Sequence, residues 1–102
     1  MSKAEAKAWV EEQLAKKKVV GFSKTYCPFC KKAKKALQQM GCDFLWIEIE
    51  NMSNMDAIQD VLLEMTKARS VPRVFVNGKC IGGGDDTVRL KENGQLQKMI
   101  DS

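Results

Sequence analysis

Two cysteines separated by two residues are the part of this sequence best suited to chemistry. Cys27 and Cys30 enclose a Pro-Phe pair and follow a short apolar run at residues 18–22. This spacing puts both thiols on one face of a helix, one turn apart, where they can form a disulfide with each other. The pair predicts thiol–disulfide exchange or half of a zinc site, because thiolates are both nucleophiles and metal ligands.

The place of the pair in the chain predicts different roles for the two cysteines. Cys27 is expected to open a helix, where unpaired N–H groups and the helix dipole favour a thiolate. Pro28 suits the first helical position, where its missing N–H costs nothing. Cys30 is expected one turn inside the helix and less exposed, so we predict that Cys27 attacks and Cys30 resolves. Lysines crowd this segment and favour the Cys27 thiolate further: Lys24, Lys31, Lys32, Lys34 and Lys35.

Histidine is absent from the sequence. This excludes Ser-His-Asp triads, Cys-His nucleophile pairs and His-ligated metal sites. A zinc half-site is disfavoured because a second C-x-x-C is also missing. An inert pair of core cysteines is disfavoured because Pro-Phe at a strand–helix junction suits chemistry better than packing. Of the other two cysteines, Cys42 is expected to be a small buried apolar residue and Cys80 to lie on a hairpin; we assign neither a catalytic role.

Length and composition indicate one globular domain that covers residues 1–102. The 102 residues are 44% apolar and 29% charged, with a formal net charge of +4. No apolar run approaches the roughly 20 residues of a membrane helix, and the N-terminus does not resemble a signal peptide. The basic run lacks the interleaved aromatics of a nucleic-acid site. We therefore expect a cytoplasmic protein that binds neither membrane nor nucleic acid.

The elements that must position the cysteines follow from hydrophobic periodicity and turn residues. Helices are predicted at residues 3–17, from the cysteine pair to Gly41, and from a capping box at residues 53–56 to about residue 67. A last helical segment is predicted to be interrupted near residues 93–94. Strands are predicted at residues 18–22 and 44–49 and in a hairpin over residues 74–81 that turns at Asn77-Gly78.

The order α-β-α-β-α-β-β-α defines the fold class. A helix joins the first two strands, so these strands should be parallel with a right-handed crossover. The hairpin adds two antiparallel strands. The sequence thus predicts an α/β protein with a mixed four-stranded sheet and helices on both faces.

Three segments resemble the three signatures of the dithiol glutaredoxins, in the same order and with similar spacing. They are residues 24–30 (Lys-Thr-Tyr-Cys-Pro-Phe-Cys), 70–75 (Ser-Val-Pro-Arg-Val-Phe) and 80–87 (Cys-Ile-Gly-Gly-Gly-Asp-Asp-Thr). The resemblance implies the thioredoxin fold. It also implies a monomeric glutathione–disulfide oxidoreductase with glutathione as cosubstrate and no metal. Its protein partners would be glutathionylated or disulfide-bonded proteins.

The resemblance also implies which residues hold glutathione. The Val71-Pro72 peptide would be cis, and the Val71 backbone would bind the cysteine residue of glutathione like an added strand. Gly84 and Asp85 would contribute backbone N–H groups to the γ-glutamyl carboxylate at a helix N-terminus. The ammonium would pair with Asp85 or Asp86, with Asp85 favoured, and one of these two aspartates could instead serve as an N-cap.

The glycyl carboxylate would be bound by Lys24 and Gln59, with Arg69 as a weaker candidate. From the sequence alone, Gln59 and Arg69 are expected to be plain surface residues. Phe29 would flank the groove.

Two other functions are alternatives to a glutathione-dependent oxidoreductase. A thioredoxin-like reductase is disfavoured because Trp-Cys-Gly-Pro-Cys is absent and the glycine–aspartate segment is present. Some glutaredoxins hold a 2Fe–2S cluster between two subunits, through the first active-site cysteine and two glutathiones. Pro28 argues against a cluster, because cluster-binding relatives usually have another residue there.

Overall fold

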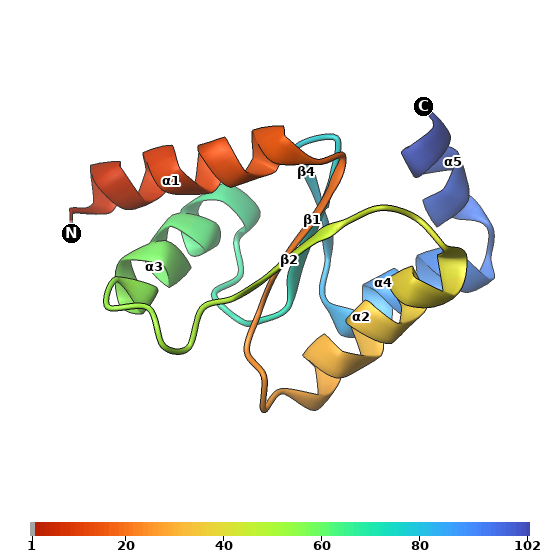
Figure 1. Ribbon diagram of the computed structural model, residues 1–102, viewed down its shortest axis with the longest axis horizontal. Coiled ribbons are helices and arrows are strands. Elements are labelled where there is room, and N and C mark those ends of the chain that lie inside the picture. The colour runs from red at the N-terminus through yellow and green to blue at the C-terminus, as the bar shows by residue number, and fades with distance from the viewer. Residues whose placement is uncertain (1) are drawn as a thin grey trace.

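The computed structural model describes residues 2–102 and shows one four-stranded sheet between two layers of helices (Figure 1). The chain runs through the elements in this order: α1 (Lys3–Lys16), β1 (Val19–Ser23), α2 (Pro28–Met40), β2 (Leu45–Glu48), α3 (Met55–Thr66), β3 (Arg73–Val76), β4 (Lys79–Gly82), α4 (Gly84–Glu92) and α5 (Gln95–Asp101). The predicted α/β fold class is confirmed. Observed boundaries differ by a residue at several ends; one of these differences places Ser23 inside β1.

The strand order in the sheet is β2-β1-β3-β4. Strand β1 is parallel to β2 and antiparallel to β3, and β3 is antiparallel to β4. The helix α2 connects β1 to β2, as the parallel crossover requires. The hairpin turns at Asn77 and Gly78, whose φ values of 52° and 78° match the two-residue turn that Asn-Gly favours.

Alternate residues of β1 belong to the two separate cores. Val20 and Phe22 pack with α1 and α3 on one face, where the ring centroids of Phe22 and Phe75 lie 5.9 Å apart in an edge-on contact. Val19 packs with α2, α4 and α5 on the other face. In Figure 1 the pair α1 and α3 lies across the strands from the pair α2 and α4. Residue parity along a strand therefore decides which layer a side chain meets.

The ends of α2 follow the sequence signals, whereas the start of α3 does not. Cys27 is the N-cap of α2, Pro28 is its first residue, and Gly41 ends it with a φ of 68°. The predicted capping box at residues 53–56 is wrong: the N-cap of α3 is Asn54. Backbone hydrogen bonds from Met52 to Ile49 and from Met55 to Met52 turn the chain here, so Ser53 falls within a turn.

Candidate active site

Cys27 lies where α2 begins, against the loop that precedes β3. Its φ and ψ of −88° and 118° are extended, and its carbonyl accepts the N–H of Lys31 at 3.1 Å. The half-buried Sγ contacts the Val71 carbonyl at 3.6 Å. The Val71-Pro72 peptide is cis, as the resemblance implied. Segments 44 residues apart thus form one site around this sulfur.

Cys30 is buried in the first turn of α2, with 1% of its surface exposed. Burial is the main reason why its pKa rises to about 11, and the neighbouring Cys27 adds to the rise. Hydrogen bonding to Ser23 and to the Lys24 backbone acts in the opposite direction. A thiol with this pKa is protonated near neutral pH. The predicted difference in exposure between the two cysteines is therefore present in the structure.

A carboxylate from the end of β2 holds the loop that carries Lys24. Glu50 accepts the backbone N–H of Thr25 at 2.8 Å and also its hydroxyl group. The Thr25 hydroxyl is the largest cause of the lowered pKa of Glu50. The N–H of Cys27 then donates to the Lys24 carbonyl at 3.2 Å, which closes the turn into α2. Glu50 is a site residue that was not predicted from the sequence; its only signal was its position just after a strand parallel to β1.

The two aspartates at the start of α4 have different partners. Asp86 accepts the N–H of Gly83, the N-cap residue, at 3.0 Å and pairs with Arg89 at 3.2 Å. The bond from Gly83 is the main cause of the lowered pKa of Asp86. Asp85 instead reaches Lys32 on α2 at 2.9 Å. Neither aspartate is the N-cap, so that alternative from the sequence is wrong; Asp86 lies three residues after the N-cap Gly83 and closes a capping box.

Gly84 allows the start of α4 to lie directly against the start of α2. A Cβ added at Gly84 would lie 2.5 Å from the Phe29 carbonyl oxygen and 3.0 Å from the Phe29 Cβ. The glycine thus allows close packing between the N-termini of α2 and α4. The Phe29 ring is 52% exposed and the Tyr26 ring 66%, so both aromatic rings face solvent beside Cys27.

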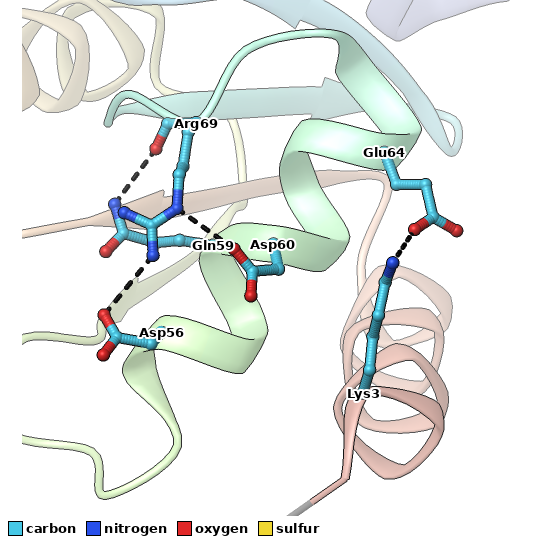
Figure 2. A network of polar contacts seen from close by, with 6 residues as sticks. All are labelled: Lys3, Asp56, Gln59, Asp60, Glu64 and Arg69. Carbon is cyan, nitrogen blue, oxygen red and sulfur yellow. Dashed lines mark hydrogen bonds and ion pairs between the residues drawn. The ribbon is translucent and has the colours of Figure 1, made fainter.

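Gln59 and Arg69 fasten the segment that precedes Val71 to α3 (Figure 2). The Nε2 of Gln59 donates to the Arg69 carbonyl at 3.0 Å. The Arg69 guanidinium lies between Asp60, at 3.2 Å, and Asp56, at 3.3 Å. Gln59 is only 5% exposed, so its prediction as a surface residue is wrong, whereas Arg69 is exposed as predicted. A buried amide with a backbone partner is a structural support for the loop.

Residues 2–102 contain neither a cluster of metal ligands nor a helix that could span a membrane. No group of three or more His, Cys, Asp or Glu side chains in this range is placed to hold a metal ion. Nor does any helix of that range have the length and apolar character that crossing a membrane requires.

Comparison with known proteins identifies the class to which this fold and site belong. The family model described as glutaredoxin matches residues 19–81. Glutaredoxin-C6 of Oryza sativa subsp. japonica is 44% identical over 95 residues, which are 93% of this chain and 85% of that protein. The chain therefore belongs to the glutaredoxin family of glutathione-dependent thiol–disulfide oxidoreductases.

Solved structures agree with this assignment. Oxidized glutaredoxin 2 from Chlamydomonas reinhardtii superposes with a TM-score of 0.93 at 50% identity, covering 99% of this chain and 95% of that one. A buckwheat glutaredoxin in complex with glutathione superposes with a TM-score of 0.92 at 37% identity, covering 97% and 90% of the two chains. The thioredoxin fold that the resemblance implied is confirmed.

Proposed function

We propose that this protein removes glutathione from glutathionylated protein cysteines through Cys27. The observation that carries the proposal is the Cys27 sulfur, half-buried at a helix N-terminus and 3.6 Å from the Val71 carbonyl. The Cys27 thiolate attacks the glutathione sulfur of the mixed disulfide, and the substrate thiolate leaves. A second glutathione then attacks the Cys27 adduct, which releases oxidised glutathione and restores Cys27.

Cys30 supplies a second route on the same site. Its sulfur attacks Cys27 in the adduct, glutathione leaves, and a Cys27–Cys30 disulfide forms. Two glutathione molecules then reduce that disulfide. This route reduces protein disulfides as well, because a substrate protein can take the place of glutathione in the mixed disulfide.

The proposed glutathione groove has one element for each part of the tripeptide. The Val71 backbone, in the loop with Pro72, binds the cysteine residue. The backbone N–H groups of Gly84 and Asp85 at the start of α4 bind the γ-glutamyl carboxylate. Asp85 leaves its pair with Lys32 to meet the ammonium. Asp86 keeps its capping bond, which supports the shape of this site.

Lys24 and Gln59 are the proposed partners of the glycyl carboxylate. Lys24 supplies the charge. The Nε2 of Gln59 already donates one N–H to Arg69 and carries a second N–H that the carboxylate can accept. Phe29 flanks the groove with its exposed ring and contacts the substrate protein.

At the level of the whole protein, we propose a single monomeric domain over residues 1–102. It works in the cytoplasm, where it carries electrons from glutathione to protein disulfides and so contributes to redox homeostasis. The glutathione complex of the buckwheat relative supports glutathione as the cosubstrate.

The test compares Cys27→Ser and Cys30→Ser on a glutathionylated peptide with glutathione and glutathione reductase present. We expect no turnover by Cys27→Ser and substantial turnover by Cys30→Ser. Retained activity in Cys27→Ser, or complete loss in Cys30→Ser, would sink the assignment.

A further inference from the structure

A small cavity lies beside Cys30, on the side of α2 that faces the sheet. Its volume is about 190 Å³. It is lined by Ser23, Lys24, Thr25, Cys30, Lys31, Lys34, Trp46 and Glu48. A single water needs a cavity of only about 10–15 Å³, so this cavity has room for several waters.

Glu48 is the carboxylate of this cavity, and part of it lacks a partner. Its Oε2 atom is buried and makes no hydrogen bond within the described part of the chain. A buried carboxylate oxygen without a donor is costly, so it needs either a water or a function.

The strand register places Glu48 on the same side of the sheet as Cys30. Glu48 is the cross-strand partner of Ser23 in the parallel β1–β2 pair. Trp46, two residues earlier in β2, packs with the core under α2 and α4, and the alternation of β-strands turns Glu48 the same way. Ser23 is 1% exposed, its Oγ donates to the Lys24 carbonyl at 3.5 Å, and its interaction with the Cys30 thiol lowers the pKa of Cys30. Ser23, the Cys30 thiol and the Glu48 carboxylate thus line the same cavity.

We propose that Glu48 accepts the proton of Cys30, through the Ser23 hydroxyl or water in the cavity, when Cys30 resolves the Cys27–glutathione adduct. This inference rests on the proposed function, since it concerns the second route on the same site. The proton moves from Cys30 to Glu48, and the Cys30 thiolate attacks the Cys27 sulfur. The Cys27–glutathione S–S bond breaks, glutathione leaves as a thiolate, and the Cys27–Cys30 bond forms. The proton of Glu48 then passes to solvent, and the steps reverse when glutathione reduces the disulfide.

The need for such an acceptor follows from the burial of Cys30. Its pKa of about 11 leaves very little thiolate near neutral pH. A general base accelerates this step by removing the proton as the sulfur attacks. The other ionisable groups facing the cavity are Lys24 from the loop after β1 and Lys31 and Lys34 from α2. Their ammonium groups are electrostatically compatible with an ionised carboxylate at Glu48.

The experiment follows one turnover without free glutathione. Reduced protein is mixed with a glutathionylated peptide, and quenched samples are read by mass spectrometry for the Cys27 adduct and its loss. Formation of the adduct tests the proposed function. Loss of the adduct measures the attack by Cys30 and tests Glu48.

For Glu48→Gln we expect adduct loss to slow by about 100-fold near pH 7, at the low end of general-base effects. The difference from the unmodified protein should shrink as the pH approaches 11, because hydroxide then deprotonates Cys30 in both proteins. Glu48→Asp keeps a carboxylate in the cavity and should lie between the two. Asp43→Asn, which removes an exposed carboxylate just before β2, is the matched control and should keep the original rate at every pH.

The contrary outcome is equally specific. A carboxylate that acted only through its charge would disfavour the Cys30 thiolate, so its removal would speed adduct loss at all pH values. Equal or faster loss in Glu48→Gln, with normal adduct formation, overturns the role of Glu48 and leaves the proposed function intact. Absence of the Cys27 adduct in Cys30→Ser, which cannot resolve it, overturns the proposed function itself.

Discussion

Cys27 and Cys30 lie one helical turn apart and differ in the properties that govern thiol reactivity. Cys27 is half-buried at the N-terminus of α2, beside the Val71 carbonyl. Cys30 is buried on the sheet side of the same turn, and burial raises its pKa to about 11. The same helix thus holds one half-buried sulfur at its N-terminus and one buried sulfur whose raised pKa keeps it protonated near neutral pH.

At the residue scale, we predict that Cys30 resists alkylation near neutral pH. In Cys27→Ser, iodoacetamide should modify Cys30 at least about 100-fold more slowly at pH 7 than it modifies Cys27 in Cys30→Ser. A raised pKa means that Cys30 gains reactivity only as the pH climbs well above its ordinary value of 9.0. Peptide-resolved mass spectrometry distinguishes Cys30 from Cys42 and Cys80. A Cys30 that titrates at or below about pH 9 would contradict this picture.

At the scale of elements, the loop before β3 depends on α3. Gln59 binds the Arg69 carbonyl from inside, and Asp56 and Asp60 hold the Arg69 guanidinium from outside (Figure 2). The Gln59 side chain is buried, whereas the outer ion pairs are exposed. Their contributions to stability and to the position of Val71 should therefore differ.

We predict that Gln59→Ala lowers the free energy of unfolding by about 2 kcal/mol, because it removes a buried side chain together with its hydrogen bond to the Arg69 carbonyl. Turnover should fall as well, since the loop carries the Val71 backbone. Asp60→Asn is the control, and its loss of an exposed ion pair should cost less than about 1 kcal/mol. Urea denaturation and steady-state kinetics provide the two readouts. Equal effects of the two substitutions would show that the buried bond does not hold the loop.

The contact between the starts of α2 and α4 gives a third prediction. Alanine is normally a better helix residue than glycine by about 1 kcal/mol. Gly84→Ala should nevertheless destabilise the protein by about 1–3 kcal/mol, because the new Cβ would overlap the Phe29 backbone.

Gly83→Ala is the matched control for this contact. Its φ of −100° suits alanine, and the nearest atom to the added Cβ is the movable end of the Arg73 side chain. Its cost should stay below about 1 kcal/mol, in the range of N-cap substitutions. Thermal unfolding compares the two variants; a stabilised Gly84→Ala would refute the close contact.

The elements were predictable to the extent that they follow local signals. Pro28, Gly41 and the Asn77-Gly78 turn each mark a boundary in the sequence and in the structure. The start of α3 was not predictable, because backbone turns at residues 49–55 override the apparent capping box.

The site could be predicted only in part, because some of its residues depend on contacts between segments that are distant in the sequence. The place of the cysteine pair at the start of α2 and the greater burial of Cys30 follow from spacing and helix position. Glu50, Glu48 and the burial of Gln59 depend on how β2 and α3 lie against distant segments. Strand alternation placed Glu48 on the same face as Trp46, but only the register with β1 brings it to Ser23 and Cys30.

At the scale of the whole molecule, the protein joins two cores across one sheet, and the proposed groove lies where both layers meet the loops. The loop with Lys24 ends β1, the segment before β3 comes from α3, and α4 brings Gly84 and Asp85 from the opposite layer. A complete groove therefore requires the whole fold.

We predict that the protein remains a monomer without a cluster after anaerobic reconstitution with iron, sulfide and glutathione. Pro28 occupies the first helical position beside Cys27, where cluster-binding relatives usually have another residue. Size exclusion should give a mass near 11.5 kDa, and the sample should lack visible absorption. A coloured species of twice that mass would contradict the prediction.

The most direct test of the central claim is to locate the glutathione on the enzyme during turnover. Cys30→Ser is mixed with a glutathionylated peptide in the absence of free glutathione, trapped with acid and mapped by peptide mass spectrometry. Our account predicts one glutathione per protein, on Cys27. A glutathione on Cys42 or Cys80 would contradict it. So would reduction of the peptide with no glutathione attached to the protein.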